Sequence, residues 1–313
     1  MDPQVDALLQ MMAAQAAASG VPPLNEQPAD VARAGAELAF QAFNQPMPAG
    51  ITAKDSTIPG PAGEIPIKVF RPEAAAGTLP LLVFLHGGGW VIGSPATHAK
   101  LAAELSLGAN IVVVSVDYRM APEHPAPASL DDCVAAIRWS VDHAGELGAD
   151  GSNFAIGGDS AGGNLTAAAC LRLRDEGGPQ AKLQLLIYGA FALDPNTESC
   201  LANAEGKILT RDSMIWFTNH YLSGGATTDD PYVAPIKGNL AGLPPAHLIV
   251  GTLDPLLDDS KAFAAKLTEA GVPNNLSVYP DMPHVFVQLS ALLDGGKAGV
   301  AECVAALRGA LRP

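Results

Sequence analysis

The pattern of apolar residues along the chain predicts buried strands separated by helices. Near-continuous apolar runs without alternation are typical of strands that are buried on both faces of a sheet. Such runs, with a shorter one at 154–156, cover 79–86, 111–117, 183–188 and 246–250. Helical stretches lie between them, around 97–107 and from Ser129 past Trp139. Strands that alternate with helices predict an α/β fold with a mostly parallel central sheet and helices on both faces.

Three segments depart from this rhythm. Residues 65–71 alternate apolar and polar side chains, which predicts an antiparallel edge strand. Residues 1–50 contain two helical stretches, at 5–19 and about 29–43, that are too small to form a domain alone. Residues 190–240 carry aromatic side chains but no strand–helix unit. We predict that 1–50 and 190–240 form a helical cap, and that 51–189 and 241–313 form the core.

Composition narrows the class of protein. The 313 residues are 48% hydrophobic and only 16% charged, which indicates a large buried core. The net charge of −14 disfavours nucleic-acid binding, because that function requires clustered Lys and Arg. The four cysteines are far apart and match neither a zinc site nor a dense disulfide framework. The chain shows no basic leader region and no apolar run of membrane-spanning length, so we expect a soluble cytoplasmic protein.

A G-x-S-x-G motif stands at the end of the run at 154–156. It comprises Gly158, Asp159, Ser160, Ala161 and Gly162, and an Ala-rich helical stretch follows. In this motif a buried strand turns sharply into a helix and exposes the serine, and the glycines permit the close approach of neighbouring backbone. The motif alone could also be a glycine-rich turn with an incidental serine, so other parts of the chain must decide its function.

A second motif, His86-Gly87-Gly88-Gly89-Trp90, follows the buried run at 79–85. Three consecutive glycines allow the backbone to approach a ligand and to direct N–H groups into a pocket. Acyl-transfer enzymes use such donors to bind the oxyanion of the tetrahedral intermediate. We expect His86 to anchor this loop. The two motifs occur in the order and on the elements that lipases and esterases use.

An acid and a base complete the pattern further along the chain. Asp254 follows the strand predicted at 246–250, and His284 lies in a loop after a short strand predicted at 276–278. Both are therefore expected at the carboxyl edge of the sheet, where catalytic groups gather. Asp258 and Asp259 are alternatives, but they precede a helical pattern and are predicted to cap it. Asp281 is a further alternative, and we assign it a turn role.

The chain resembles the hormone-sensitive-lipase-like esterases, the bacterial family IV of the α/β-hydrolase superfamily, over about 70–286. The motifs that carry the resemblance are 86–90, 118–125, 158–163, 254–258 and 282–284. The resemblance implies an α/β-hydrolase fold with a helical cap. It also implies ester hydrolysis by Ser160, with His284 as general base and Asp254 orienting it. It implies, in addition, oxyanion donors from the N–H groups of Gly88, Gly89 and Ala161.

Three positions depart from the family pattern. Asp281 and Val285 stand where glycine is frequent beside the histidine, and Gly189 stands where proline is common. None of the departures removes a catalytic group.

The combined prediction is a serine carboxylesterase that acts through an acyl-enzyme on small esters with short to medium acyl chains. No cofactor, metal, nucleic acid or membrane is expected, and a homodimer is left open. The candidate substrate-pocket residues are Trp90, Asp159, Phe191, Leu209, Trp216 and Phe217. Two alternatives stay open, namely an amidase or peptidase with the same triad, and a non-catalytic small-molecule receptor on this fold.

Overall fold

The computed structural model describes residues 1–43 and 46–312 and contains one eight-stranded sheet in that part of the chain. The strand order is β1-β2-β4-β3-β5-β6-β7-β8, in which β1, β2 and β4 pair antiparallel and all other neighbours pair parallel. The strands are β1 Ile51–Gly60, β2 Gly63–Pro72, β3 Leu79–Leu85, β4 Val112–Val116, β5 Ala149–Asp159, β6 Gln184–Ile187, β7 Ala246–Leu253 and β8 Asn274–Pro283. The predicted mostly parallel sheet is confirmed.

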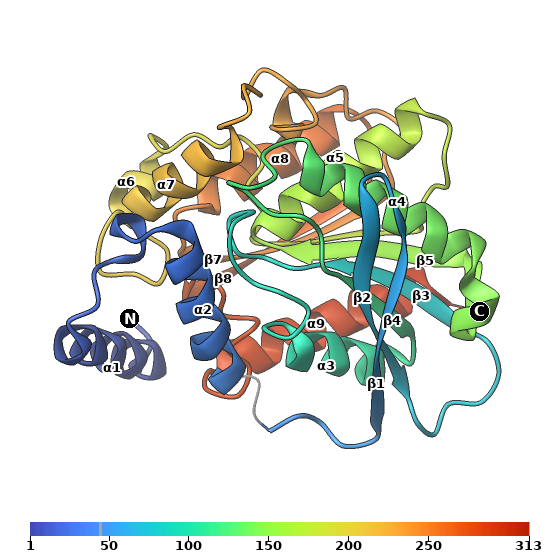
Figure 1. The fold of residues 1–313 in the computed structure, drawn as a ribbon, viewed down its shortest axis with the longest axis horizontal. Coiled ribbons are helices and arrows are strands. Elements are labelled where there is room, and N and C mark those ends of the chain that lie inside the picture. Colours follow the sequence, from blue (N-terminus) through green and yellow to red (C-terminus); the bar gives the residue numbers. More distant parts are fainter. Residues whose placement is uncertain (44–45, 313) are drawn as a thin grey trace.

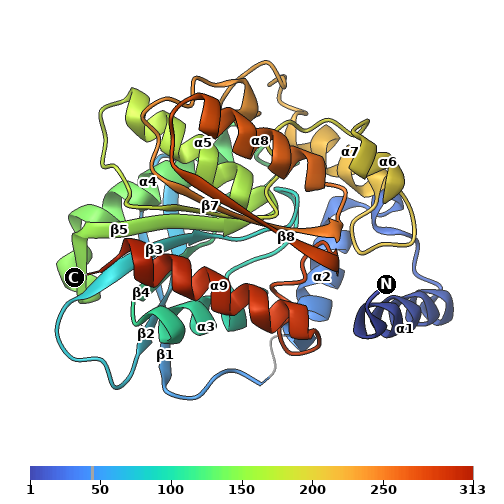
Figure 2. The same cartoon turned by 180° about the vertical axis from the view of Figure 1, so that it is seen from behind.

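Helices cover both faces of the sheet (Figures 1 and 2). One face carries α4 (Ala128–Asp142), α5 (Ala161–Asp175) and α8 (Leu257–Glu269), and the other carries α3 (Ala99–Ala109) and α9 (Asp294–Ala310). Alternate residues of the central strands supply two cores, since Leu81 and Val83 pack into one core and Leu82 and Phe84 into the other. This two-sided burial explains why the central strands are continuously apolar.

The prediction that residues 65–71 form the edge strand is wrong. They lie in β2, which is paired on both sides, and the edge is β1. The sequence of β1 is largely polar because only Ile58 of its ten residues is buried. Strand β1 therefore lacks the apolar alternation that predicts a half-buried strand, and a hairpin turn at 60–63 holds it against β2.

Two sets of helices lie together at one end of the sheet, and we call them the cap segments (residues 1–43 and 190–240) (Figures 1 and 2). The first set is α1 Pro3–Ser19, the short helix η1 Leu24–Glu26 and α2 Ala29–Phe43. The second set is α6 Glu198–Ala202 and α7 Arg211–Tyr221. The short helix η3 Pro235–Lys237, also within 190–240, contacts α5 and α8 on one face of the sheet instead. The short helix η2 Ala144–Leu147 belongs to the core. Helix α7 packs against η1. Residues 44 and 45 of the predicted 1–50 segment lie outside the described residues.

Helix α1 is attached to the core by a small apolar contact. It ends at Gly20, whose φ of 63° is the left-handed conformation that glycine favours at a helix C-terminus. Val5 and Leu8 are its buried residues, and they join the core that contains Phe286 and Leu293. No helix in the described ranges has the length and apolar character needed to cross a membrane.

Candidate active site

Ser160 occupies a strained turn between β5 and α5. Its φ and ψ are 52° and −118°, a conformation that side chains rarely adopt. The flanking glycines make the turn possible, because a Cβ on Gly158 or on Gly162 would collide with the backbone oxygen of Leu85 in β3. A Cβ on Gly163 would lie 2.9 Å from Cα of Gly189. The glycine spacing therefore reflects how closely the elbow is packed against β3 and the segment after β6.

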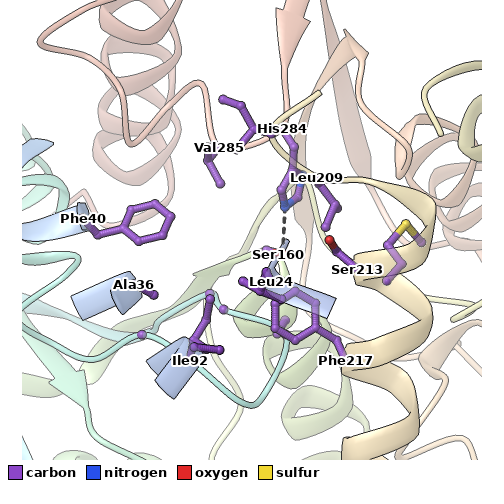
Figure 3. A pocket seen from close by; sticks show the side chains of 18 of the residues that line it. Leu24, Ala36, Phe40, Ile92, Ser160, Leu209, Ser213, Phe217, His284 and Val285 are labelled. Carbon is purple, nitrogen blue, oxygen red and sulfur yellow. Dashed lines mark hydrogen bonds between the residues drawn. The ribbon is translucent and has the colours of Figure 1, made fainter. Parts of the chain in front are cut away.

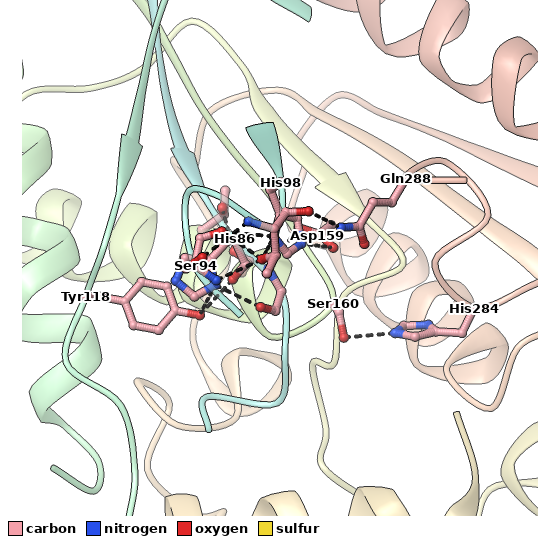
Figure 4. A network of polar contacts seen from close by, with 12 residues as sticks. His86, Ser94, His98, Tyr118, Asp159, Ser160, His284 and Gln288 are labelled. Carbon is pink, nitrogen blue, oxygen red and sulfur yellow. Dashed lines mark hydrogen bonds and ion pairs between the residues drawn. The ribbon is translucent and has the colours of Figure 1, made fainter. Parts of the chain in front are cut away.

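The structure brings together Ser160, His284 and Asp254. His284 Nε2 lies 2.9 Å from Ser160 Oγ (Figures 3 and 4). His284 Nδ1 lies 2.8 Å from Asp254 Oδ2. Asp254 is fully buried, and its second oxygen accepts a hydrogen bond of 2.8 Å from the N–H of Leu256. A carboxylate can only accept, so Nδ1 carries the proton and Nε2 is left to accept from the serine hydroxyl. The ring of Tyr188 packs against His284, with ring centroids 4.8 Å apart.

The alternative carboxylates are engaged elsewhere. Asp258 and Asp259 lie in the first turn of α8, as predicted, but they do not cap that helix. They accept hydrogen bonds from the backbone of residues 190–199 instead. Asp258 accepts from the N–H of Ser199, and Asp259 accepts from the N–H groups of residues 191 and 192. Burial raises the pKa of Asp259 to about 6, although the two N–H donors oppose that shift. Asp281 pairs with the amino group of Met1 at 3.4 Å.

The glycine loop after β3 lies beside the serine. Gly88 and Gly89 have φ values of 120° and 57°, and they line the same cavity as Ser160 and Ala161. In the described part of the chain, no protein acceptor takes the N–H groups of Gly88 and Gly89. Ala161 is the first residue of α5, so its N–H has no acceptor within the helix. Three N–H donors therefore border the space in front of the serine hydroxyl.

His86 anchors the glycine loop, as expected. Its ring stacks on Tyr118 with centroids 4.3 Å apart, and the Tyr118 hydroxyl donates to the His86 carbonyl at 2.7 Å. Burial, together with the neighbouring His98, lowers the pKa of His86 to about 3. His86 is therefore neutral near pH 7 and acts as a structural support.

A cavity of about 510 Å³ opens in front of Ser160 and is mostly apolar. Figure 3 shows Ser160 and His284 between Phe40 of α2 on one side and Ser213 of α7 on the other. Both cap segments contribute to the wall, together with the loops of the core. The apolar lining includes Met12, Val21, Leu24, Ala32, Ala36, Phe40, Ile92, Leu193, Leu209, Met214, Phe217 and Val285.

Four of the six predicted pocket residues, Trp90, Asp159, Leu209 and Phe217, line this cavity, and two do not. Phe191 is fully buried and stacks on Phe263 of α8, with centroids 4.2 Å apart, so it is a core residue. Trp216 packs against Phe217 and His220 on α7. Consecutive helical residues point about 100° apart, so only Phe217 of the pair faces the cavity.

Three of the predicted residues that line the cavity also make specific contacts with the glycine loop or the cap segments. Trp90 stacks on Tyr221 of α7, with centroids 4.3 Å apart, and so joins the glycine loop to the cap. The carboxylate of Asp159 is directed to the N–H of Gly87, at 2.9 Å, and not into open space. The ring of Phe217 lies against Gly89, where a Cβ would collide with it.

Sequence reasoning missed most of the wall that the N-terminal segment supplies. Ala32, Ala36 and Phe40 lie four residues apart on α2 and share one face, which a helical spacing of small and apolar residues could have revealed. Val285, which the sequence presents only as a departure from the family pattern, lines the cavity next to His284. No group of three or more His, Cys, Asp and Glu side chains in the described ranges could hold a metal ion.

The fold and this geometry define the class of an α/β enzyme with a serine nucleophile at a strand–helix elbow. A family model described as the alpha/beta hydrolase fold matches residues 82–288. The carboxylic ester hydrolase LipN of Mycobacterium tuberculosis is 42% identical over 265 residues, which cover 82% of this chain and 70% of that protein. The carboxylesterase NlhH of the same species is 41% identical over 252 residues, 79% of each chain.

A solved structure has the same fold as this chain. An alpha/beta hydrolase enzyme from the metagenome of Lake Arreo, Spain, superposes with a TM-score of 0.94 at 36% identity, over 99% of this chain and 98% of the other. The chain belongs to the α/β-hydrolase fold family, and the predicted resemblance to its hormone-sensitive-lipase-like esterases is confirmed.

Proposed function

We propose that the protein is a serine carboxylesterase that hydrolyses small esters with short to medium acyl chains. The observation that carries this proposal is the hydrogen-bonded series Ser160–His284–Asp254, which opens on an apolar cavity beside the glycine loop. The names of the two mycobacterial relatives, a carboxylic ester hydrolase and a carboxylesterase, support it.

The geometry allows the two half-reactions of acyl transfer. His284 Nε2 accepts the proton of Ser160 while Oγ bonds to the ester carbonyl carbon, and the carbonyl oxygen becomes an oxyanion. The N–H groups of Gly88, Gly89 and Ala161 are the donors placed to bind it. The protonated imidazole then gives its proton to the leaving alcohol, which leaves an acyl-enzyme. Water, deprotonated by His284, repeats the sequence and releases the acid and the free serine.

Asp254 acts without taking the proton. Its buried carboxylate holds the tautomer of His284 in which Nε2 is free to accept, and it stabilises the imidazolium that forms during each half-reaction. The proton transfers of both half-reactions are therefore assigned to side chains of this chain, with water as the second nucleophile.

The cavity supports a limit on substrate size. Its volume of about 510 Å³ is at the lower part of the range of small-molecule sites and has to hold both the acyl and the alcohol portions of an ester. The apolar lining favours hydrocarbon chains. We propose that the cap segments set this limit, because Phe40 and Phe217 close the cavity from two sides.

The two alternatives differ from the esterase in measurable ways. An amidase would use the same triad, because acyl transfer to water does not depend on the leaving group. A non-catalytic receptor has no need of a base within hydrogen-bond distance of the serine, and here His284 is in place. A cytoplasmic location is also proposed, in keeping with four buried cysteines that form no disulfide. The homodimer stays a prediction.

A chain-length series of p-nitrophenyl esters, with a matched anilide, tests the function. We expect the highest kcat/KM for butyrate or hexanoate, little cleavage of the anilide, and a loss of hydrolysis in Ser160→Ala. A fluorophosphonate should label the parent protein but not Ser160→Ala. Anilide cleavage as fast as ester cleavage would favour the amidase, and an unlabelled, inactive parent would favour the receptor.

A further inference from the structure

The glycine loop is held by a buried polar network that the mechanism above does not use (Figure 4). The N–H of Gly87 donates to Asp159 Oδ1 at 2.9 Å. His98 Nε2 lies 3.3 Å from both oxygens of that carboxylate. His98 and Asp159 are 4% and 1% exposed, so water does not screen their interaction. The network thus reaches the residue immediately before the predicted oxyanion donors Gly88 and Gly89.

The chemistry of the groups sets the direction of these hydrogen bonds. Burial opposes ionisation of Asp159, but the neighbouring His98 and the N–H of Gly87 outweigh it and hold the pKa of this carboxyl below its usual value. An ionised carboxylate can only accept, so His98 Nε2 carries a proton. His98 Nδ1 lies 2.8 Å from the hydroxyl oxygen of Thr97. The imidazole is therefore held at both nitrogens.

The turn that carries His98 is attached to helix α2. The Ser94 hydroxyl lies 2.9 Å from both carboxylate oxygens of Glu37 and accepts from the N–H of Thr97 at 3.2 Å. The N–H of Ser94 in turn donates to the Thr97 hydroxyl at 2.8 Å. A continuous polar route therefore leads from α2, which lines the substrate cavity, to the glycine loop.

The loop that carries the catalytic imidazole is attached to the same turn. Gln288, four residues after His284, donates from Nε2 to the carbonyl of Thr97 at 2.7 Å. Gln288 is 4% exposed and lines the substrate cavity. The turn at 94–98, in which Thr97 and His98 are buried, therefore contacts α2, the glycine loop through Asp159, and the loop of His284.

We propose that His98 is a positioning residue that fixes the oxyanion donors through Asp159, and that Glu37 links this arrangement to α2. The inference rests on the proposed ester hydrolysis. Without the His98 contact, the Asp159 carboxylate is buried with one neutral donor and rotates or draws in water, and Gly87 moves with it. A loop that places Gly88 and Gly89 wrongly loses transition-state stabilisation while substrate binding in the apolar cavity is retained.

The test compares His98→Leu, which removes the contact, with His98→Gln, whose side-chain amide can still donate to Asp159. We expect His98→Leu to lower kcat on p-nitrophenyl butyrate by about 10²-fold, the lower end of the range for loss of one oxyanion donor, with KM nearly unchanged. His98→Gln should recover most of the rate. A boronic acid that forms a tetrahedral adduct with Ser160 should bind His98→Leu more weakly by a similar factor, which a merely structural role would not produce.

Glu37→Ala tests the link to α2, and Glu123→Gln is its matched control. Arg33 of α2 pairs with Glu123 at 2.8 Å, so this control removes the charge of an ion pair made by the same helix without contacting the turn at 94–98. We expect Glu37→Ala to lower kcat and weaken the boronic acid, and Glu123→Gln to do neither. Equal effects of the two variants would overturn the link.

An active parent whose His98→Leu variant keeps the parental kcat and boronic-acid affinity would overturn the positioning role. If His98→Leu fails to fold, Glu37→Ala and His98→Gln provide the comparison. An inactive parent would instead refute the proposed function itself, so the two failures are distinguishable.

Discussion

The replacement Asp254→Asn probes the most specific feature of the site. The carboxylate accepts two hydrogen bonds, from His284 Nδ1 and from the N–H of Leu256, both at 2.8 Å. An asparagine has one acceptor and one donor for these two neighbours. If its oxygen faces Leu256, its NH₂ faces Nδ1, and the imidazole must then place its proton on Nε2. In that tautomer His284 cannot accept the proton of Ser160.

The backbone N–H of Leu256 selects this inactive orientation. The opposite orientation would place the NH₂ of the asparagine against that N–H, and two buried donors that face each other cost about 1–3 kcal/mol. The inactive arrangement is therefore favoured about 5- to 150-fold, at about 1.4 kcal/mol for each factor of ten. Loss of the negative charge removes the stabilisation of the imidazolium as well. We expect kcat to fall on the order of 10⁴-fold, with KM little changed.

The assay is kcat on p-nitrophenyl butyrate at pH 7.5, with the rate of fluorophosphonate labelling of Ser160 as a second readout. Both should fall together, because both need the hydroxyl to be activated. Circular dichroism checks that the variant is folded. An Asp254→Asn protein that is folded and retains a kcat within tenfold of the parent would refute the tautomer argument.

Three further predictions follow from the packing and the charges. Phe191→Ala should cost about 3–5 kcal/mol of stability in urea unfolding and leave the acyl-chain preference unchanged, whereas Phe217→Ala should shift that preference to longer esters; the reverse pattern would contradict the assignments. Gly89→Ala should lose activity because its Cβ meets the ring of Phe217, and adding Phe217→Ala should restore part of it; no recovery would contradict the clash. Burial, with the nearby Glu37, raises the pKa of Asp117 to about 6, so the folded state binds that proton more tightly than the unfolded chain and loses stability as pH rises from 4 through 6. Asp117→Asn should therefore be more stable than the parent at pH 8, by up to about 3 kcal/mol at about 1.4 kcal/mol per pH unit, and equal to it near pH 4; urea midpoints that differ equally at both pH values would refute this.

The parts of the fold that sequence could predict are those in which burial alone determines the residue type. Strands β3 and β4 are apolar at nearly every position because both of their faces pack against helices. The sequence therefore predicts them as central strands. Strand β1 could not be predicted in this way. It is held by backbone pairing with β2, and such pairing leaves no pattern in the side chains. The edge of the sheet was consequently misplaced by one strand.

The residues of the site likewise differ in whether the sequence could predict them. Ser160 and the glycine loop carry local motifs, because their chemistry needs particular residues at particular spacings. The cavity wall has no such motif. Whether an aromatic residue faces the cavity or the core depends on its helix and rotation, and for this reason Phe217 lines the cavity while Phe191 stacks on Phe263. Pairs that form only when distant segments meet, such as His98 with Asp159, are likewise invisible before the fold is known.

Backbone strain at the site shows what the surrounding core contributes. Trp90, Ser160 and Val285 have φ values of 61°, 52° and 61°, and each lies on one of the three loops that meet at the cavity. A non-glycine residue in such a conformation costs about 1–3 kcal/mol and persists only where its surroundings impose it. Trp90 is held by its stacking on Tyr221, and Val285 by burial of its side chain. The two cores and the cap therefore stabilise a strained geometry that none of the three local sequences would adopt alone, and the catalytic arrangement is a property of the whole fold.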